Sequence, residues 1–484
     1  MASRIVVLGA GISGHTAAAF ARKWLGKHGT VTVVSPKDYY NWIPSNIWVG
    51  VGLMRPEQVT FPLRPVYDRH GIEFVHGSAR AIHPEGDTTD PTPFVAVEPA
   101  GAPAADRIRV PYDYLVNATG PRLRFDKTPG LGPDGFSHSV CTEEHAVQAS
   151  SALIESVERM RRGERQRFVV GVGHGTCTCE GAAFEYIVNL EFELRARGVR
   201  DRADILWLTN EYELGDFGMG GMHFRYGGYV MPSSAFNASL FAERGIDWVT
   251  RVHVRQVDKG TLHYETLAGD VVEQPFDFAM LLPPFSGVGI KAFDRTGADI
   301  TPVLFQPNEF MRVDADYEPK PYEAWRAADW PRTYQSPAYP NVFAAGIAFA
   351  PPHAISRPYT SPSGAAIAPA PPRTGMPSAM IGKAVAGSIV DMIHGSDRPT
   401  RTASMAEMGA ACVASAGANP FTGTAASMTV FPIVPDLERY PEYGRDLGRT
   451  FGEIGLAGHW IKILLHHLFL YKARLRPGWS LIPE

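Results

Sequence analysis

The fold of this chain is decided by one stretch near its start, Ile5-Val-Val-Leu-Gly9-Ala-Gly11-Ile-Ser-Gly14. A short apolar run enters a Gly-x-Gly-x-x-Gly turn, and an alanine-rich stretch of helical composition follows at residues 15–25. In such a strand–turn–helix unit, Gly9 permits the tight turn, Gly11 lets a pyrophosphate approach the backbone, and Gly14 lets helix and strand pack closely. Because amides at a helix start hold phosphates, we expect a dinucleotide site here.

The composition is typical of a large globular protein. With 484 residues, 45% of them hydrophobic and 20% charged, the chain is expected to hold two or three domains. A net charge of −4 gives no reason to expect nucleic acid as a partner. The four cysteines are too few for a disulfide scaffold, which leaves redox chemistry, metal binding or plain burial. We see no signal peptide, and no apolar run reaches the roughly 18 residues of a membrane span.

The first dinucleotide unit continues into a buried strand at residues 30–34, which ends in Ser35-Pro-Lys37-Asp38. An acid usually stands at this strand end to bind the ribose, so Ser35 or Lys37 is expected to contact the ribose or phosphates instead. The loop at 39–52 is rich in aromatic residues and glycine, which suits packing on a flat ring and equally suits a plain buried loop. A later strand ends in Ala118-Thr119-Gly120, where small residues let the chain return beneath a cofactor.

A second strand–turn–helix unit, with a degenerate glycine motif, begins at residue 167. Its glycines are displaced, and Thr176 stands where a nicotinamide site has a small residue. The next strand, at 205–209, ends in Asn210-Glu211. We interpret this half as a Rossmann-like domain that has lost NAD binding.

The chain then returns towards the first unit. A strand near 342 ends in Gly346-Ile347, at a position where many flavoproteins have Gly-Asp. Residues 350–374 are rich in proline, serine and alanine and predict an irregular insertion, and a helix is expected at 378–394.

The C-terminal tail, from residue 458, predicts an amphipathic helix. Its apolar residues recur with helical spacing, and its basic residues lie at its end. The apolar stripe consists of Trp460, Ile461, Leu464, Leu465, Leu468 and Tyr471, with Lys462 and His466 opposite and Lys472, Arg474 and Arg476 at the end. The pattern favours a helix lying in a membrane interface over a terminal helix docked on the core. His466 and His467 are expected to be solvated.

Taken together, these motifs resemble those of the sulfide:quinone oxidoreductases, monotopic flavoproteins with two dinucleotide-binding domains. The resemblance rests on motifs spread from residue 5 to about 390: Gly9–Gly14, Pro44–Gly52, Ala118–Pro121, Cys141–His145, Cys179–Tyr186, Phe343–Ile347 and Thr374-Gly375. It implies an α/β fold with two Rossmann-like domains in a glutathione-reductase-like arrangement. It implies an FAD-binding domain at 1–150 and 316–400, a second Rossmann-like domain at 151–315, and a C-terminal region at 401–484.

The resemblance also implies the residues of the sites. Cys179 and Cys412 match the family's redox pair, Cys141 matches a third cysteine that links to the flavin in some members, and Glu185 is a candidate proton relay or a plain surface carboxylate. The FAD-binding set comprises Gly9, Gly11, Gly14, Ser35, Lys37, Asn46, Thr119, Gly120, Gly346, Ile347, Thr374 and Gly375. The candidate quinone residues are Phe469, Tyr471 and Val413. No metal site is expected.

The implied activity is oxidation of sulfide. HS⁻ attacks the Cys179–Cys412 disulfide, leaving a persulfide and a thiolate, and two electrons pass through FAD to a membrane quinone while polysulfide or sulfur is released. Position at a helix N-terminus favours the thiolate of Cys179. The protein is thus expected on a membrane surface, as a possible homo-oligomer. The alternatives are a type II NADH:quinone oxidoreductase, the flavoprotein subunit of a cytochrome-linked sulfide dehydrogenase, and a flavin-binding sensor without enzyme activity.

Overall fold

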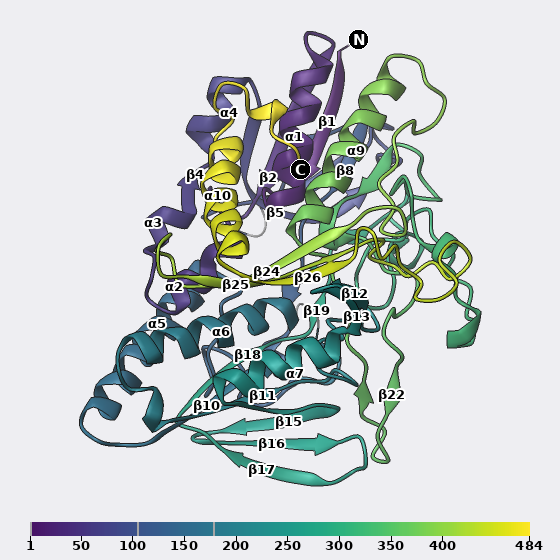
Figure 1. Cartoon of the computed structure of the whole chain (residues 1–484). Coiled ribbons are helices and arrows are strands. Elements are labelled where there is room, and N and C mark those ends of the chain that lie inside the picture. Colours follow the sequence, from purple (N-terminus) through teal and green to yellow (C-terminus); the bar gives the residue numbers. More distant parts are fainter. Residues whose placement is uncertain (1, 104–105, 178–179) are drawn as a thin grey trace.

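A computed structural model describes residues 2–103, 106–177 and 180–484 (Figure 1). The first sheet has a parallel core in the order β21-β8-β1-β2-β5, and β6 and β7 extend it antiparallel. Its strands are β1 (Ser3–Leu8), β2 (Gly29–Ser35), β5 (Glu73–His83), β6 (Phe94–Pro99), β7 (Ile108–Pro111), β8 (Tyr114–Asn117) and β21 (Val342–Ala344). The short β20 (Lys291–Ala292) also pairs with β5. Residues 342–344 therefore return to the sheet in which the chain begins.

A second parallel sheet has the order β14-β11-β10-β18. Its strands are β10 (Gln166–Val172), β11 (Ala203–Leu208), β14 (Ile246–Val249) and β18 (Phe278–Leu282). Helices α5 (Glu143–Arg161), α6 (Glu180–Ala196) and α7 (Ser233–Arg244) belong to this part of the chain. An antiparallel sheet of β15 (Val252–Asp258), β16 (Thr261–Thr266) and β17 (Val271–Pro275) lies below it in Figure 1.

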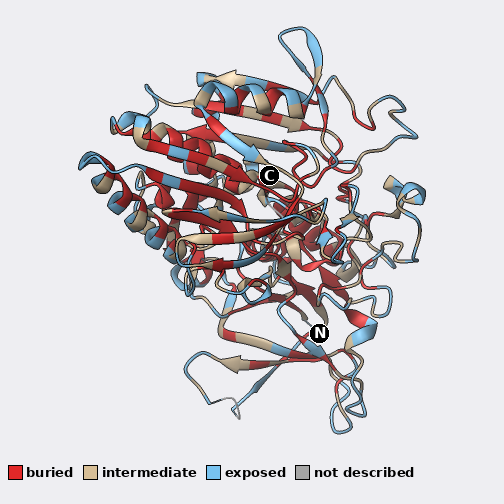
Figure 2. Cartoon of the chain, turned by 90° about the horizontal axis from the view of Figure 1, so that it is seen from below, coloured by how far each residue is buried: buried red, intermediate tan, exposed pale blue. Residues whose placement is uncertain are grey.

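The C-terminal region adds a third large sheet, in the order β13-β12-β26-β25-β24. β12 (His223–Tyr226) and β13 (Tyr229–Pro232) come from the middle of the chain, whereas β24 (Ala410–Ala416), β25 (Thr424–Val430) and β26 (Phe451–Gly455) come from its end. Helix α10 (Leu456–Ala473) follows and packs on this sheet. Figure 2 shows buried strands at the centre and exposed loops around them.

The remaining short elements lie in the connections. They are β3 (Tyr39–Asn41), β4 (Thr60–Pro62), β9 (Arg122–Leu123), β19 (Phe285–Ser286), α2 (Asn46–Gly50), α3 (Pro56–Val59), α4 (Arg64–His70) and α8 (Thr301–Leu304). The α/β class and the two Rossmann-like units are therefore as expected, and the four domain boundaries stay a prediction.

The first glycine turn has the predicted geometry. Gly9 has φ +98°, and a Cβ placed on it would lie 2.2 Å from the carbonyl oxygen of Ala118. A Cβ on Gly14 would lie 2.1 Å from the carbonyl oxygen of Gly9. A Cβ on Gly11, which caps α1 (Ile12–Leu25), meets no atom within 4 Å. The fold itself therefore requires Gly9 and Gly14, whereas Gly11 faces open space.

Helix α9 (Gly375–Ile393) begins three residues before the expected start, because Pro377 is tolerated in the first turn of a helix. It packs against α1. By length and composition α9 is apolar enough to cross a bilayer, the one such helix in the part of the chain described here, although 61% of its apolar window is buried as in a core helix. We expected no apolar run of that length, and the sequence of α9 is in fact interrupted by Lys383 and Asp391.

The insertion at 350–374 is less irregular than predicted. It contains a β-hairpin of β22 (Tyr359–Thr360) and β23 (Ala366–Ile367). Proline and glycine content therefore predicted the turns but missed the short pairing between them.

Alanine at Gly14 and at Gly11 should separate the needs of the fold from those of a ligand. We expect Gly14→Ala to lower the free energy of unfolding by roughly 1–3 kcal/mol, because the added methyl group would clash with backbone, which cannot move aside as a side chain can. Gly11→Ala should change it by less than about 1 kcal/mol. Denaturant unfolding of the protein without cofactor measures both, and equal losses would contradict the assignment.

Candidate functional site

The first glycine turn meets three later segments of the chain. A Cβ on Gly346, which has φ +65°, would lie 2.7 Å from Cβ of Ser13. A Cβ on Gly375 would lie 3.2 Å from Cδ1 of Ile12 and 3.9 Å from Cγ of Pro44. Thr374 is the N-cap of α9. The structure thus brings the first glycine turn together with the Gly346-Ile347 turn and the start of α9, both of which lie more than 300 residues later in sequence.

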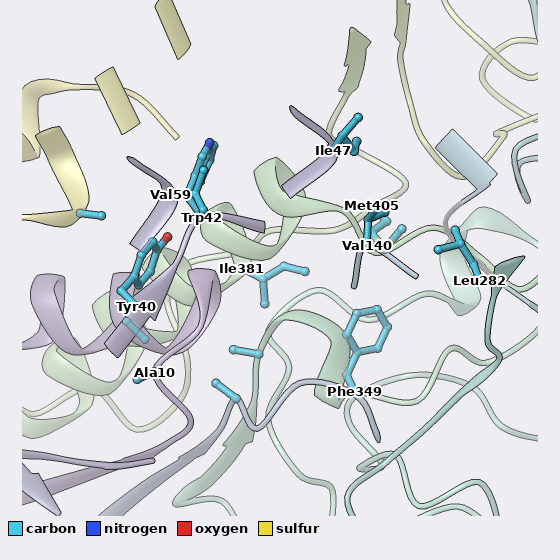
Figure 3. Close-up of a cluster of buried hydrophobic side chains, with 14 of the residues drawn as sticks. Ala10, Tyr40, Trp42, Ile47, Val59, Val140, Leu282, Phe349, Ile381 and Met405 are labelled. Carbon is cyan, nitrogen blue, oxygen red and sulfur yellow. The ribbon is translucent and has the colours of Figure 1, made fainter. Parts of the chain in front are cut away.

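Several features of this region fit a bound dinucleotide. A Cβ on Gly11 or on Gly120 would meet nothing within 4 Å, so both leave room beside the backbone. The Ser13 hydroxyl and the Trp48 indole N–H are buried and have no hydrogen-bond partner. Figure 3 shows buried side chains from several segments, including Ala10, Trp42 and Ile381, gathered in one cluster. The residues present fit FAD, which supplies a two-electron acceptor when bound.

Other predicted FAD residues already have partners inside the protein. The Ser35 hydroxyl donates to the Lys37 carbonyl oxygen at 2.8 Å, and the Lys37 ammonium donates to the Tyr39 hydroxyl at 2.7 Å and pairs with Glu143 at 3.5 Å. The Thr119 hydroxyl donates to the Asn117 side chain at 2.9 Å. These contacts hold the strand ends in place and leave the roles of these residues towards FAD a prediction.

Asn46 is fully buried and acts as a brace within the protein. Its side-chain amide bonds to that of Asn41, and its Nδ2 donates to the Val140 carbonyl oxygen at 3.4 Å. This carbonyl immediately precedes Cys141. Asn46 therefore links the aromatic loop to the cysteine-bearing turn.

Cys412 lies against the first turn of α6. It stands on β24, and a Cβ on Gly181 would lie 3.4 Å from its Sγ. Cys179 lies outside the described residues. Burial raises the pKa of the Cys412 thiol to about 11, and the nearby Glu185 carboxylate adds to the shift. In this geometry Cys412 carries its proton at neutral pH.

Glu185 and Lys462 form an almost buried ion pair beside Cys412. Nζ of Lys462 lies 2.9 Å from Oε2 of Glu185, and the backbone N–H of Ser415 donates to Oε1 at 3.4 Å. Burial raises the pKa of Glu185, and the Lys462 charge opposes that shift. A surface position for Glu185 is therefore excluded. A buried carboxyl of this kind is suited to accept and release protons.

Sequence reasoning missed Lys462 as the partner of Glu185. The signal was a lysine in an otherwise apolar stretch of helix, which we placed on the side facing away from the stripe. That placement was right, but the side faces the protein and not the solvent.

The other two cysteines have different environments. Cys177 is fully buried, and its thiol donates to the Leu282 carbonyl oxygen at 3.0 Å, which suits a structural role. Cys141 is partly buried, and burial raises the pKa of its thiol to about 11. Its backbone N–H donates to the Ser139 hydroxyl at 3.1 Å.

Three apolar side chains of helix α10 point outward. Trp460, Ile461 and Leu464 are 52%, 51% and 60% exposed, respectively. Lys462 points inward to Glu185, and His466 is buried and bonded to the Ser45 hydroxyl at 2.8 Å. A soluble amphipathic helix has the opposite arrangement.

Two expectations about this tail were wrong. His466 is not solvated, because it fills the interior face of α10, whereas His467 is exposed as expected. Lys472 is not part of an exposed basic end, because its ammonium donates to the carbonyl oxygens of Ile482 and Pro483 and pairs with Glu484.

Two of the three candidate quinone residues, Phe469 and Tyr471, lie on α10. Tyr471 lines a cavity of about 410 Å³ together with Gln58, His466, His467, Leu470, Arg474 and Arg476. The Phe469 ring stacks on Trp42 with 5.2 Å between centroids. Val413 instead lies on β24 beside Cys412. Val413 therefore neighbours Cys412, the predicted redox cysteine, and is not among the residues that line the cavity.

Comparison with known proteins agrees with this geometry. Residues 3–199 match the family described as pyridine nucleotide-disulphide oxidoreductase. The chain is 29% identical to sulfide-quinone reductase of Aquifex aeolicus, over 98% of this chain and 92% of the relative. A shorter match, 28% identical over 37% of this chain and 31% of the relative, is to the mitochondrial external alternative NAD(P)H-ubiquinone oxidoreductase B3 of Arabidopsis thaliana.

Solved structures give the same ranking. The sulfide:quinone oxidoreductase of Aquifex aeolicus superposes with a TM-score of 0.75 and 26% identity, covering 99% of this chain and 94% of that one. NDH2 of Plasmodium falciparum gives a TM-score of 0.62 at 12% identity, covering 98% and 96%, which shows a shared fold alone. The chain is therefore an FAD-dependent oxidoreductase of the sulfide-quinone reductase kind, related to that enzyme over almost its whole length.

Proposed function

We propose that this protein is a membrane-associated flavoenzyme that oxidises sulfide through a Cys179–Cys412 disulfide and passes two electrons through FAD to a quinone. The observation that carries the proposal is the position of Cys412 against Gly181, in the turn of α6 that directly follows Cys179 in sequence. The relative from Aquifex aeolicus is named for reduction of quinone by sulfide. That name and the placement of Cys412 point to the same chemistry.

The proposed sulfur chemistry balances with two sulfide ions for each turnover. One HS⁻ attacks a disulfide sulfur, so that a persulfide bond forms, the Cys–Cys bond breaks and one cysteine leaves as thiolate. A second HS⁻ takes the outer sulfur as HSS⁻, the shortest polysulfide, and leaves one thiol beside the thiolate. Re-forming the disulfide from the thiol and the thiolate releases two electrons and one proton, and FAD supplies the two-electron acceptor. The sum is two HS⁻ giving HSS⁻, one proton and two electrons.

Glu185 is the group suited to handle the proton. Its carboxylate contacts Ser415, three residues beyond Cys412, and is held by Lys462. Because burial raises the pKa of Glu185, its protonated and ionised forms lie closer in energy near neutral pH than those of a solvated carboxyl. Lys462 keeps the ionised form accessible.

Removing either redox cysteine tests the proposal. We expect Cys412→Ala and Cys179→Ala each to slow bleaching of the flavin by sulfide by roughly 100-fold or more, because no disulfide remains for HS⁻ to attack. The measurement is anaerobic titration of the purified flavoprotein with sulfide, followed by decylubiquinone. Cys177→Ser is the matched control, since a hydroxyl keeps the hydrogen bond to Leu282. Sulfide reduction at the wild-type rate in Cys179→Ala would overturn the mechanism.

The Glu185–Lys462 pair predicts a pH effect. In Lys462→Met no cation opposes burial, so the pKa of Glu185 rises further and its ionised form appears only at higher pH. The Glu185-dependent limb of the rate of flavin reduction by sulfide should therefore move to higher pH by about one unit or more. Lys462→Arg keeps the charge and should leave the limb in place, and Glu185→Gln should remove it. Identical profiles for wild type and Lys462→Met would contradict a proton role for Glu185.

Association with a membrane is supported by the outward face of α10. Its exposed apolar side chains, Trp460, Ile461 and Leu464, lie along one side, while Lys462 and His466 of the same helix make polar contacts inside the protein. Leu481, in the segment after α10, is 86% exposed. Apolar surface of this kind suits a helix that lies in the interface of a bilayer, with the Tyr471 cavity near by as a route for quinone.

Charge on this face should weaken membrane binding. We expect Ile461→Glu/Leu464→Glu to lower sedimentation with phospholipid vesicles about tenfold or more, because each buried aliphatic side chain contributes roughly 1.5–3 kcal/mol. Val271→Glu, on the exposed strand β17, is the control and should bind vesicles like wild type. Flavin reduction by sulfide in detergent should persist in both. Unchanged sedimentation of the double variant would rule out α10 as the membrane contact.

The second candidate is a type II NADH:quinone oxidoreductase. The sequence match to the Arabidopsis oxidoreductase favours it. It predicts bleaching of the flavin by NADH and no loss of activity in Cys179→Ala. The same anaerobic titration, with NADH in place of sulfide, separates the two candidates.

A further inference from the structure

The second glycine loop, residues 173–177, is covered by a segment of the chain itself. This segment is the insertion at 350–374, whose hairpin β22–β23 reaches down beside the sheet β15–β17 (Figure 1). In a Rossmann-like unit this loop follows the first strand, here β10, and is where a dinucleotide pyrophosphate binds. The insertion therefore lies where a nicotinamide nucleotide would have to enter.

The contact is made backbone to backbone. The N–H of Ala368 donates to the carbonyl oxygen of Gly175 at 2.8 Å, and the N–H of Ala370 donates to that of Cys177 at 2.9 Å. A Cβ on Gly175 would lie 2.0 Å from the carbonyl oxygen of Ala366. A glycine that permits close approach is a hallmark of a pyrophosphate site. Here the close approach is made by the protein backbone.

The N–H of Gly175 also has an internal partner. It donates to Nδ1 of His253 at 3.0 Å. Burial lowers the pKa of His253, so the ring is neutral and able to accept. Nδ2 of Asn210 lies 3.0 Å from the Gly175 carbonyl oxygen and 3.3 Å from that of Cys177, and donates to both. The Gly175 N–H, a donor that could bind a phosphate, is thus used by His253, and the neighbouring carbonyl oxygens also have partners within the chain.

The end of β11 is closed as well. In a nicotinamide site an acid at this strand end binds the adenosine ribose. Glu211 stands there but is fully buried, and its carboxyl group accepts from the Phe217 N–H at 2.7 Å and the Thr209 hydroxyl at 3.0 Å. It is therefore committed to the protein interior.

Side chains anchor the hairpin over this region. The Tyr359 ring stacks on Tyr212, with 4.6 Å between centroids, just beyond the end of β11. The Arg251 guanidinium lies 3.8 Å from the centroid of the same Tyr212 ring. The Ser363 hydroxyl donates to the buried Glu265 carboxylate, with its two oxygens at 2.6 and 2.7 Å. The hairpin is thus fixed at both its base and its tip.

We propose that residues 359–370 are an internal plug that occupies the nicotinamide-dinucleotide site of the second Rossmann-like unit and so determines that the enzyme does not accept NADH. Steric filling, and not Thr176 alone, then excludes the nucleotide. This inference does not depend on the sulfide chemistry, because neither redox cysteine takes part in nucleotide binding.

The test is to remove the plug from the holoenzyme. Tyr359 and Ile367 are register partners in the hairpin, so a Gly-Ser-Gly link can replace residues 359–368 without straining the ends. We expect wild type to show no saturable NADH binding up to about 1 mM, a concentration at the upper end of common KM values. The shortened variant should bind NADH saturably below that concentration, by equilibrium dialysis and by quenching of tryptophan fluorescence. Thr176→Gly with the plug intact should behave like wild type.

Two further results decide the matter if the shortened variant loses FAD. Tyr359→Ala/Ser363→Ala releases both anchors, and should raise hydrogen exchange at the amides of Ala368 and Ala370 and allow NADH to bind. Tyr359→Phe/Ser363→Thr keeps the ring and the hydroxyl and should leave both measurements unchanged. The inference is overturned if wild type binds NADH, or if a folded variant with raised exchange binds NADH no better than wild type.

Discussion

This structure depends on the close approach of backbone to backbone at two glycine turns. At the first turn Gly9 and Gly14 have no space for a side chain, because Ala118 and Gly9 itself lie against them. That closeness holds β1, β8 and α1 together and leaves Gly11 facing open space for a ligand. At the second turn Gly175 is just as crowded, but its neighbour is Ala366 of the insertion. The same residue type thus keeps one site open and lets the chain close the other.

The orientation of α10 rests on a different interaction, the ion pair between Lys462 and Glu185. An almost buried charge has a large cost unless it is paired, so Lys462 cannot turn to the surface without leaving Glu185 unpaired inside the protein. His466, bonded to Ser45 one turn further along, adds a second inward polar contact. With these two residues turned inward, the helical repeat turns Ile461 and Leu464 outward. The exposed apolar face therefore follows from internal polar bonding.

The sequence predicted what depends on local spacing and missed what depends on distant partners. The strand, turn and helix around Gly9 were predicted because all their determinants lie within some twenty residues, and the return of Gly346 and Gly375 followed from motif resemblance. The inward position of His466 depends on Ser45, which lies 421 residues earlier in the chain. The partners of Lys472 are the last three residues, 10 to 12 positions later. The spacing of apolar residues along the helix reveals neither contact. The hairpin at 359–367 was hidden by proline and glycine, which indicate turns but not what the turns cover.

On the proposed function, the two halves of the chain have different tasks, because the electrons come from a small anion. A nicotinamide donor needs a wide site beside the flavin, whereas HS⁻ needs only a reachable sulfur atom. An enzyme whose second Rossmann-like site is filled by residues 359–370 loses no electron donor if its donor is HS⁻. The same segment holds the carbonyl oxygen of Cys177, two residues before Cys179, through the N–H of Ala370. A segment that excludes the wrong reductant thus also braces the loop leading to the proposed redox cysteine. The backbone hydrogen bonds of Ala368 and Ala370 hold the segment in the position from which it does both.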